Sequence, residues 1–432
     1  MSDIRIEPIM TPFTVKLSPP GSKSLTNRAL VLAALADGRS NLSNVLFADD
    51  TLVMLDCLSR LGFAMDIDRP AYAVRIAGSG GGIPAPAAEL FCGNSGTTIR
   101  FLAALCALGR GKFNLDGIPR MRQRPIGPLV DLLKNLGVRI EFVQNEGFPP
   151  IDVFADGLAG GLIRFGSSSS SQYLSAVLQV APYARHEVRV DLDSPQTSWP
   201  YVAMTMRLMD EFGVTPELIR DPLTGDPRQI IIPREKYRAT GYAIEPDASN
   251  AAYFLAAAAI HPEASVMIEG LGKQSLQGDV GFADVLRRMG AEVKVTNESI
   301  TVTGGESLEA IEIDLSSMPD QAQTLGVVAL FARGETIIRG LHTLRVKETD
   351  RIAALAAELK KLGAEVEVQG DDLFITPPKS LRAAAIDTYD DHRMAMSFGV
   401  AGTRSEGVTI KDAGCVNKTY PNYFEDLAKL RT

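Results

Sequence analysis

The sequence predicts an α/β protein built from six similar units, and two recurring markers support this prediction. The first marker is a Leu-Gly, Phe-Gly or Met-Gly pair that follows an apolar helical stretch and precedes an alternating strand. Its glycines recur about every 75 residues, at Gly62, Gly137, Gly213, Gly290 and Gly363. Glycine as a C-terminal cap, followed by period-two alternation, is typical of a helix–turn–strand connection.

The second marker has the same spacing and consists of small or acidic residues that open alanine-rich helices. It occupies residues 21–24, 93–98, 167–172, 246–250, 319–322 and 390–393. A sixth helix of the first kind, residues 422–430, ends the chain. Because each unit then carries two helices and several strands, the pattern predicts an α/β architecture.

The helix openings divide the six units into two halves. The first three openings are rich in Gly, Ser and Asn, whereas the last three each carry an aspartate, Asp247, Asp320 or Asp391. The natural break lies near residues 239–242. Residues 4–17 are expected to form a strand without a unit of its own, which could complete either half.

Composition bounds the function classes. The 432 residues are 45% hydrophobic and 22% charged, as in globular proteins with more than one core. A net charge of −8 argues against a general nucleic-acid surface, although a local basic pocket is still possible. No apolar run approaches the ~20 residues that span a bilayer, and residues 1–7 do not resemble a signal peptide, so a cytoplasmic protein is expected.

Cysteine and histidine usage gives no sign of a metal site or of disulfides. The four cysteines lack paired spacing and lie in apolar segments, so they are expected to be buried free thiols. His392 stands between Asp391 and Arg393 at a helix start, whereas the other three histidines, His186, His261 and His342, are expected at the surface. No set of these residues has metal-ligand spacing.

The most informative single stretch is residues 19–28. Two prolines and a glycine bring the chain into a turn, and Ser22 and Ser24 are good caps for the helix that follows. Lys23 should then lie at a helix N-terminus with Arg28 about one turn on, an arrangement that favours an anion. The spacing differs from a Walker A loop, and a capped surface helix with a solvated lysine is the alternative.

Two further helix openings share this character. Residues 93–100 combine glycines, which permit close backbone approach, with Asn94 and Arg100. Residues 167–171 are all Ser and run directly into a helical pattern, which favours a hydroxyl-lined helix start. An ordinary helix cap and a flexible linker, respectively, are the alternatives.

Two clusters of charge complete the candidate sites. Arg120, Arg122 and Arg124 alternate, so in an extended chain their guanidiniums would point to one side and suit a phosphate or carboxylate. In the second cluster, Glu348 lies between the cations Lys347 and Arg351 just before a helix that Thr349 or Asp350 can cap. Solvated loops are the alternative for both.

Taken together, these motifs resemble the 5-enolpyruvylshikimate-3-phosphate synthase family of enolpyruvyl transferases. The resemblance covers nearly the whole chain, and its motifs are specific as an ordered set. They are residues 20–24 with Asn27 and Arg28, 93–97, 120–127, 170–172, 346–351 and 391–396.

The resemblance implies two domains of three βαβαββ units each, an inside-out α/β barrel in each domain. The first domain would span residues 21–240, and the second residues 1–20 and 241–432, with the active site in the cleft between them. The implied reaction joins phosphoenolpyruvate to the 5-hydroxyl of shikimate 3-phosphate and releases phosphate, without cofactor or metal. No nucleic-acid or membrane partner and a monomeric state are expected.

The resemblance also assigns residues. Those matching the family's shikimate 3-phosphate ligands are Lys23, Ser24, Arg28, Ser170, Ser171, Gln172, Ser198, Asp320 and Lys347. Those matching its phosphoenolpyruvate ligands are Lys23, Asn94, Gly96, Arg124, Gln172, Arg351, Arg393 and Lys418. Lys23, Asp320 and Glu348 match its catalytic residues, Asp320 as the base on the 5-hydroxyl and Glu348 as the acid on the methylene. Thr343 departs from the family pattern, which often has asparagine there.

Two alternatives remain at this point. The sister enzyme that transfers enolpyruvate to UDP-N-acetylglucosamine would share the fold, but it usually carries a reactive cysteine in the loop matching residues 119–125, where this chain has none. A non-catalytic anion-binding protein would not need Lys23, Asp320 and Glu348 together.

Overall fold

The computed structural model describes residues 3–166, 170–194 and 196–431, which form two compact units. We call Gly21–Ile244 the central unit, and Met1–Pro20 with Glu245–Thr432 the terminal unit. The division lies after Ile244 rather than after residue 240, because the short strand β14 (Gly241–Ala243) pairs with strand β3 (Asp37–Ser43). Among the described residues, no helix is both long and apolar enough to span a bilayer.

The central unit contains three four-stranded sheets, with strand orders β14-β3-β5-β4, β6-β7-β9-β8 and β10-β11-β13-β12. Its helices are α1 (Lys23–Leu35), α2 (Asp49–Arg60), α3 (Gly96–Cys106), α4 (Gly127–Asn135), α5 (Gln172–Val180) and α6 (Trp199–Glu211), with 3-10 turns η1 (Met121–Gln123) and η2 (Ala181–Tyr183). Its other strands are β4 (Met65–Asp68), β5 (Ala73–Ser79), β6 (Ala87–Phe91), β7 (Arg110–Asp116), β8 (Arg139–Phe142), β9 (Ile151–Asp156), β10 (Gly161–Phe165), β11 (Val188–Leu192), β12 (Glu217–Arg220) and β13 (Pro227–Ile232).

The terminal unit has sheets of order β16-β17-β15-β2, β19-β21-β23-β22 and β1-β25-β24, and a small pair β18-β20. Its helices are α7 (Ala248–Ile260), α8 (Phe282–Met289), α9 (Ala322–Ala329), α10 (Arg351–Lys361), α11 (His392–Arg404) and α12 (Tyr423–Ala428). Its strands are β1 (Ile4–Arg5), β2 (Thr14–Leu17), β15 (Ser265–Glu269), β16 (Glu292–Val295), β17 (Ser299–Thr303), β18 (Leu308–Glu309), β19 (Glu312–Asp314), β20 (Ala332–Arg333), β21 (Thr336–Arg339), β22 (Glu365–Gln369), β23 (Asp372–Thr376), β24 (Ala384–Ile386) and β25 (Val408–Ile410). Its 3-10 turns are η3 (Gly278–Gly281), η4 (Pro319–Gln321), η5 (His342–Val346), η6 (Ala413–Lys418) and η7 (Lys429–Arg431).

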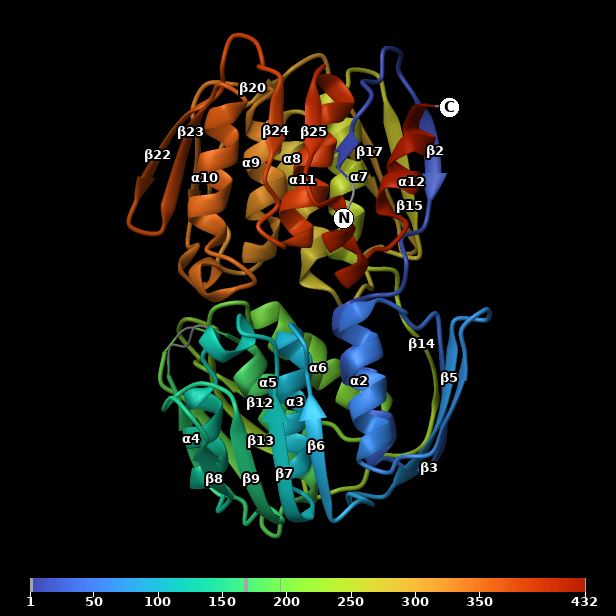
Figure 1. The fold of residues 1–432 in the computed structure, drawn as a ribbon, viewed down its shortest axis with the longest axis vertical. Coiled ribbons are helices and arrows are strands. Elements are labelled where there is room, and N and C mark those ends of the chain that lie inside the picture. The colour runs from blue at the N-terminus through green and yellow to red at the C-terminus, as the bar shows by residue number, and fades with distance from the viewer. Residues whose placement is uncertain (1–2, 167–169, 195, 432) are drawn as a thin grey trace. The chain divides into compact units, whose positions relative to one another are not determined.

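The five four-stranded sheets among the described residues share one pattern of pairing, which the β6-β7-β9-β8 sheet illustrates (Figure 1). Strands β6 and β7 run parallel and are connected through α3, as a parallel pair requires a crossover. Strand β9 pairs antiparallel with β7 and with β8, which follows α4 in the chain. The chain order of this sheet is therefore strand, helix, strand, helix, strand, strand.

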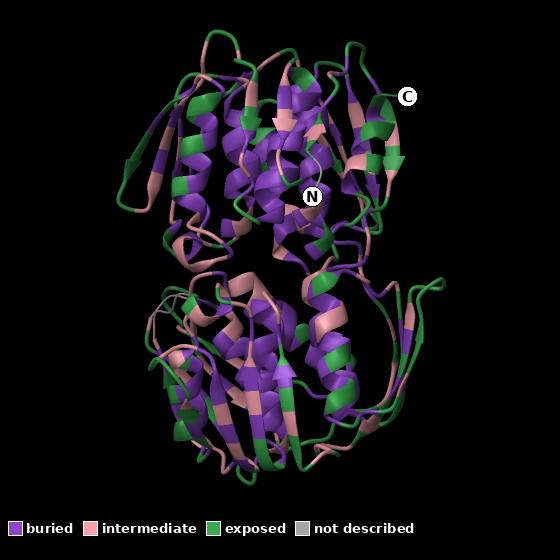
Figure 2. Ribbon diagram, in the orientation of Figure 1, coloured by how far each residue is buried: buried purple, intermediate pink, exposed green. Residues whose placement is uncertain are grey.

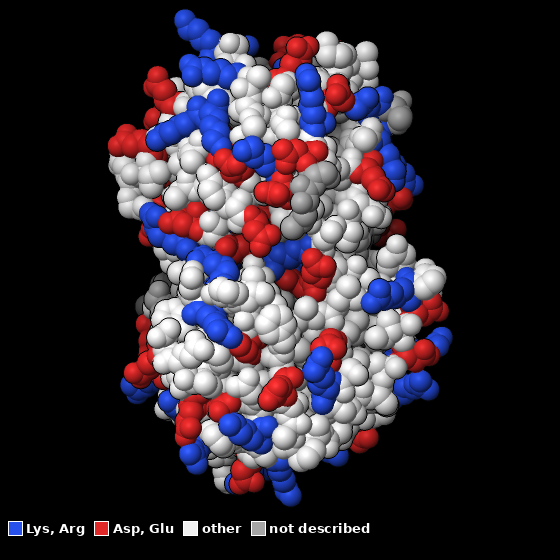
Figure 3. Space-filling view, in the orientation of Figure 1, with Lys and Arg blue, Asp and Glu red and all other residues white. Residues whose placement is uncertain are grey.

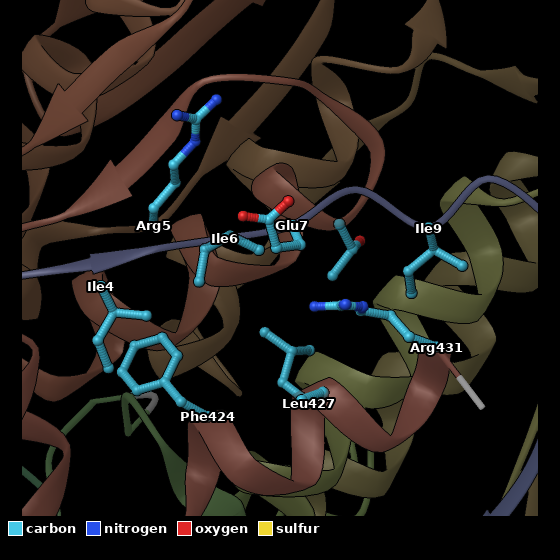
Figure 4. Close-up of a pocket in the computed structure, with 10 residues that line it drawn as sticks. Ile4, Arg5, Ile6, Glu7, Ile9, Phe424, Leu427 and Arg431 are labelled. Atoms are coloured by element: carbon cyan, nitrogen blue, oxygen red, sulfur yellow. The ribbon is translucent and has the colours of Figure 1, made fainter.

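The N-terminal segment belongs to the terminal unit. Strand β1 pairs antiparallel with β25, and β2 pairs parallel with β15 (Figure 1). Figure 4 shows Ile4, Ile6 and Ile9 of this segment facing Phe424 and Leu427 of α12 across a small pocket. Apolar contacts therefore tie both ends of the chain into the terminal unit.

The predicted helix–turn–strand marker is confirmed at every position. Gly62, Gly137, Gly213, Gly290 and Gly363 all have positive φ, between 82° and 113°. Each follows one of the helices α2, α4, α6, α8 and α10, and a strand begins shortly after it. Glycine is favoured at these turns because side chains are strained in the left-handed region.

The second marker opens the most buried helices. In α1, every residue from Leu25 to Leu35 is buried, and α3 is buried along its whole length. Helices α7, α9 and α11 are similar, as their colour in Figure 2 shows. A helix that is apolar on all sides must be surrounded by other elements, whereas α2, α4 and α10 each keep an exposed face. Ser167–Ser169 of the third opening lie outside the described residues.

The four cysteines are buried and free, as their apolar neighbours predicted. On the face drawn in Figure 3, basic and acidic side chains are intermixed, without a broad surface of one sign. His186 and His342 are exposed as predicted, but the prediction for His261 was wrong. His261 is buried, and its ring nitrogens lie 2.8 Å and 3.0 Å from the carbonyl oxygens of Ala257 and Thr403.

Candidate functional site

Lys23 is the first residue of α1, as the sequence predicted. Ser22 caps the helix, and its Oγ accepts a hydrogen bond from the Leu25 amide at 3.4 Å. The Lys23 ammonium lies 3.3 Å from a carboxylate oxygen of Asp50, a buried residue in the first turn of α2. An anion that binds at this helix start therefore meets a lysine that already has an acidic neighbour.

Arg28 is a buried cation whose bonding partners are neutral. Its guanidinium donates to Thr205 Oγ1 at 2.7 Å, Ser24 O at 3.0 Å, and Ser175 Oγ and Tyr201 O at 3.3 Å each. Among the described residues, Arg28 forms no ion pair with a carboxylate. Burial lowers the pKa of Arg28 to about 10, so it is still a cation at neutral pH. A buried cation without a counter-ion is costly, and an anionic ligand would relieve that cost.

Arg124 contacts the second predicted helix start, that of α3. Helix α3 begins at Gly96 after its capping residue, Ser95. Arg124 Nη1 donates to the carbonyl of Asn94 at 3.1 Å, and its guanidinium lies directly against Gly96. A Cβ atom on Gly96 would stand 2.6 Å from Arg124 Nη2, so only glycine leaves room for this guanidinium.

Arg120 and Arg122 do not share this site. The expected extended arginine segment is instead the 3-10 turn η1, so the three side chains do not point to one side. Arg122 Nε bonds to Asp116 Oδ1 at 2.9 Å, and the half-buried Arg120 donates to Gln123 at 3.2 Å. The prediction of three aligned guanidiniums was wrong, because hydrogen bonding within a tight turn replaces the extended backbone.

Gln172, the first residue of α5, is tied to the loop that carries Arg124. Its Oε1 accepts from Arg100 Nη1 at 2.6 Å, and Arg100 Nη2 donates to Pro125 O at 3.0 Å. Ser170 is buried, and its Oγ accepts from the Gln172 amide at 3.2 Å, while Ser171 stands at the cap position. Hydrogen bonds of Arg100 therefore connect the start of α5 to α3 and to the loop that carries Arg124.

Ser198 stands directly before α6 in a left-handed conformation, with φ of 56°. It is buried, and its carbonyl accepts from the Tyr201 amide at 3.0 Å. The Tyr201 carbonyl is one of the four acceptors around Arg28. The structure therefore brings Ser198 into the surroundings of Arg28, although the two residues are far apart in sequence.

In the terminal unit, Arg351 is the centre of a buried ionic cluster. It is the first residue of α10, and Asp350 caps this helix as predicted. The guanidinium donates to Asp391 Oδ2 at 2.7 Å, and to Asp320 Oδ1 and Glu348 Oε2 at 2.9 Å each. Burial alone would lower the pKa of Arg351, but these three carboxylates outweigh burial and raise it.

Asp320 belongs to this cluster and does not cap a helix. It lies in η4, and the structure records no capping bond from its side chain to α9. Its carboxylate bonds Arg351 and also Arg393 Nη2 at 3.1 Å, with Lys347 Nζ at 3.6 Å. Burial tends to raise the pKa of Asp320, but Arg393, Lys347 and Arg351 together hold it well below its usual value.

Glu348 is buried between two cations. One carboxylate oxygen accepts from Arg351, and the other lies 3.7 Å from Lys418 Nζ. The four cations Lys347, Arg351, Arg393 and Lys418 therefore surround the carboxylates of Asp320 and Glu348. A cluster of this composition can bind an anion and can exchange protons through its carboxylates.

Comparison with known proteins places the chain in a family. The family model of EPSP synthase (3-phosphoshikimate 1-carboxyvinyltransferase) matches residues 9–427. The chain belongs to the EPSP synthase family. Curated relatives named 3-phosphoshikimate 1-carboxyvinyltransferase include one from Trichormus variabilis, 43% identical over 100% of this chain and 99% of that protein. Another, from Shewanella baltica, is 44% identical over the full length of both chains.

Solved EPSP synthases share the mixed α/β fold. Two structures of the enzyme from Acinetobacter baumannii match with TM-scores of 0.81 and 0.82, at 27% and 25% identity. They cover 98% and 99% of this chain, and the match spans 97% and 98% of those chains. Membership of the EPSP synthase family makes the chain an enolpyruvyl transferase, and the sister enzyme that acts on a UDP-amino sugar is not favoured.

Two of the carboxylates that bond the family's cationic residues were not predicted as site residues. Asp391 was predicted only as part of a helix opening and of a family motif, yet it caps α11 and also bonds Arg351. Asp50 was not predicted, because nothing in the local sequence links it to Lys23. Thr343, which departs from the family pattern, is buried, and its hydroxyl has no hydrogen-bond partner among the described residues.

Proposed function

We propose that the chain transfers the enolpyruvyl group of phosphoenolpyruvate to the 5-hydroxyl of shikimate 3-phosphate and releases phosphate. The observation that carries this proposal is the buried cluster of Asp320 and Glu348 among four cations. Enolpyruvyl transfer needs a base, an acid and charge partners for anionic substrates, and this cluster supplies all three. Membership of the EPSP synthase family supports the choice of substrates.

In this proposal, the central unit supplies most ligands of shikimate 3-phosphate. They are Lys23, Ser24, Arg28, Ser170, Ser171, Gln172 and Ser198, joined by Asp320 and Lys347 of the terminal unit. The neutral surroundings of Arg28 support this role. No carboxylate pairs with Arg28 among the described residues, so a bound phosphate would be its first anionic partner. Lys23 would contact both substrates.

Phosphoenolpyruvate would bind Lys23, Asn94, Gly96, Arg124 and Gln172 of the central unit and Arg351, Arg393 and Lys418 of the terminal unit. The two arginines of the terminal unit already hold Asp320. An anionic substrate would compete with Asp320 for them, and each contact it takes over would raise the pKa of Asp320. Substrate binding would therefore convert a weak base into a stronger one at the moment when a base is needed.

The proton chemistry then follows from two carboxyl groups. Asp320 takes the proton of the 5-hydroxyl as that oxygen adds to the enol carbon, and Glu348 gives a proton to the methylene, which becomes a methyl group. Elimination reverses the proton flow, because the methyl group loses a proton as phosphate departs and the enol ether forms. Each positioned group would contribute about 10²–10⁴-fold to the rate.

We also propose that each unit is an inside-out α/β barrel of three βαβαββ repeats. The shared strand order of the sheets and the buried helices that begin with the second marker support this architecture. Two expectations from the sequence, the monomeric state and the cytoplasmic location, stay predictions.

The proposal is tested by a coupled phosphate-release assay with both substrates. Phosphate should appear only when phosphoenolpyruvate and shikimate 3-phosphate are both present, together with a stoichiometric enol ether. Turnover with UDP-N-acetylglucosamine in place of shikimate 3-phosphate would instead indicate the sister reaction. Release from phosphoenolpyruvate alone would indicate simple hydrolysis and contradict the proposal.

A further inference from the structure

The turn that precedes α11 has an unusual backbone. Thr388 O accepts from the Asp391 amide at 2.9 Å, and the two residues between them, Tyr389 and Asp390, have φ of 55° and 54°. Two consecutive residues other than glycine in the left-handed region are unfavourable, particularly where one is a bulky tyrosine. Such a turn persists only where its surroundings hold it in place.

Glu358 of α10 bonds the residue before the turn and the first residue inside it. Its carboxylate is fully buried, and Oε1 accepts from the Tyr389 hydroxyl at 2.8 Å. The other oxygen, Oε2, accepts from the Asp387 amide at 3.1 Å and lies 2.7 Å from Lys361 Nζ. Lys361 also bonds the Asp387 carboxylate at 2.6 Å, so the segment before the turn is fixed twice.

The same helix also bonds Asp391, the last residue of the turn, through Arg351. Arg351 and Glu358 are seven residues apart on α10, which puts them about two helical turns apart on one side. Arg351 bonds the carboxylate of Asp391, and Asp391 Oδ1 accepts from the Arg393 amide at 2.9 Å. The placement of Arg393 relative to Arg351 therefore depends on where the turn is held.

We propose that Glu358 is a positioning residue for phosphoenolpyruvate binding: by holding the turn of residues 388–391, it fixes Asp391 and Arg393 against Arg351. This inference rests on the proposed function, in which both arginines contact phosphoenolpyruvate. Glu358 itself touches neither arginine through any contact that the structure records and acts only through the turn. Without the hydrogen bonds of Glu358, Arg351 and Arg393 should still be present but misplaced. Binding of phosphoenolpyruvate should then weaken more than binding of shikimate 3-phosphate.

Two variants test the inference at opposite ends of the same hydrogen bond. Tyr389→Phe removes only the hydroxyl of a side chain that is 42% exposed, and Glu358→Gln replaces the carboxylate that accepts from Asp387 and from Tyr389. Tyr72→Phe is a matched control in the central unit. Tyr72 is 53% exposed with φ of 49°, and its hydroxyl has no hydrogen bond among the described residues.

Steady-state kinetics with both substrates should separate positioning from a general loss of structure. In Tyr389→Phe, KM for phosphoenolpyruvate should rise about three- to ten-fold, the value of one lost hydrogen bond. It should rise further in Glu358→Gln. In both variants kcat and KM for shikimate 3-phosphate should stay within about two-fold of the unmodified chain, and Tyr72→Phe should change none of them.

An unchanged KM for phosphoenolpyruvate in Tyr389→Phe would overturn the inference, even if Glu358→Gln failed to fold. Equal losses for both substrates, or a fall in kcat alone, would also overturn it by indicating a purely structural role. Absence of transfer activity in the unmodified chain is a separate result. It would overturn the proposed function first, and this inference with it.

Discussion

The buried arginines Arg28 of the central unit and Arg351 of the terminal unit have opposite surroundings. In the central unit, the buried guanidinium of Arg28 hydrogen-bonds only hydroxyl and carbonyl oxygens among the described residues. In the terminal unit, Arg351 is bonded to the carboxylates of Asp320, Glu348 and Asp391. In the proposed function, Arg28 would receive an external anion without displacing a carboxylate, whereas Arg351 would exchange internal carboxylates for an external anion.

This contrast matters for chemistry as well as for binding. A cation that lacks an internal carboxylate partner can bind a substrate phosphate without displacing a carboxylate of the protein. A cation shared with Asp320 would link substrate binding to the protonation of that carboxyl group, because each lost contact raises the pKa of Asp320. Proton transfer is therefore expected of the terminal unit, and firm anchoring of the shikimate phosphate of the central unit.

The largest expected effect comes from Arg28→Met. Shikimate 3-phosphate binding should weaken at least about a hundred-fold, since a buried charge partner of the phosphate is lost. The melting temperature should be equal or higher, because the change removes a buried cation that has no carboxylate partner in the described part of the chain. Isothermal titration and thermal melting test this, with Arg207→Met on the exposed side of α6 as the control. A strongly destabilised variant would mean that Arg28 has an internal counter-charge.

The opposite result is expected for Arg351→Met. Removing the shared cation leaves the buried carboxylates facing one another, so the terminal unit should lose about 3–5 kcal/mol of stability. Chemical denaturation followed by circular dichroism measures this loss. A variant as stable as the unmodified chain would remove the distinction between the two units.

A third variant, Gly96→Ala, sharpens the account of the central unit. The new Cβ would stand 2.6 Å from Arg124 Nη2, so this guanidinium must move. KM for phosphoenolpyruvate should rise about ten- to a hundred-fold, the usual cost of a displacement near 1 Å. Gly82→Ala is the matched control, because nothing lies within 4 Å of the added Cβ. Kinetics indistinguishable from the control would show that Arg124 does not need its place against Gly96.

The smallest predicted effect is a pH dependence of stability. The pKa of Asp320 in the folded chain lies below its usual value, because Arg393, Lys347 and Arg351 outweigh burial. Its contribution to stability is therefore present above about pH 4 and is lost as pH falls below that value. Asp320→Asn should flatten the fall in denaturation midpoint on acidification, and Asp131→Asn, an exposed change on α4, should not. Identical acid profiles for the two variants would contradict this origin of the pKa shift.

Much of the fold could be predicted because its signals are local. The five Leu-Gly-type turns depend on a glycine with positive φ, and the helix that begins at Lys23 depends on its own capping serine. Neither needs a distant partner. The sequence therefore located helix starts well, and it also named most residues of the candidate site.

The misinterpretations all involve partners that are distant in the sequence or backbone geometry that alternation does not specify. Asp391 was not predicted to contact Arg351, which lies 40 positions away in the sequence. His261 is buried because Thr403 approaches it from a remote helix. The arginines of η1 alternate in sequence, but their turn is not extended. These outcomes depend on tertiary contacts, which a local pattern does not contain.

The most direct test of the account is the fate of solvent hydrogen during turnover. In heavy water, addition and elimination through a transient methyl group should place deuterium in the vinyl group of the product, as detected by mass spectrometry. Glu348→Gln should slow this incorporation and turnover together, by about 10²–10⁴-fold, while shikimate 3-phosphate binding is largely kept. Product formed in heavy water without vinyl deuterium, or a fully active Glu348→Gln, would contradict proton transfer by the carboxylates of the terminal unit.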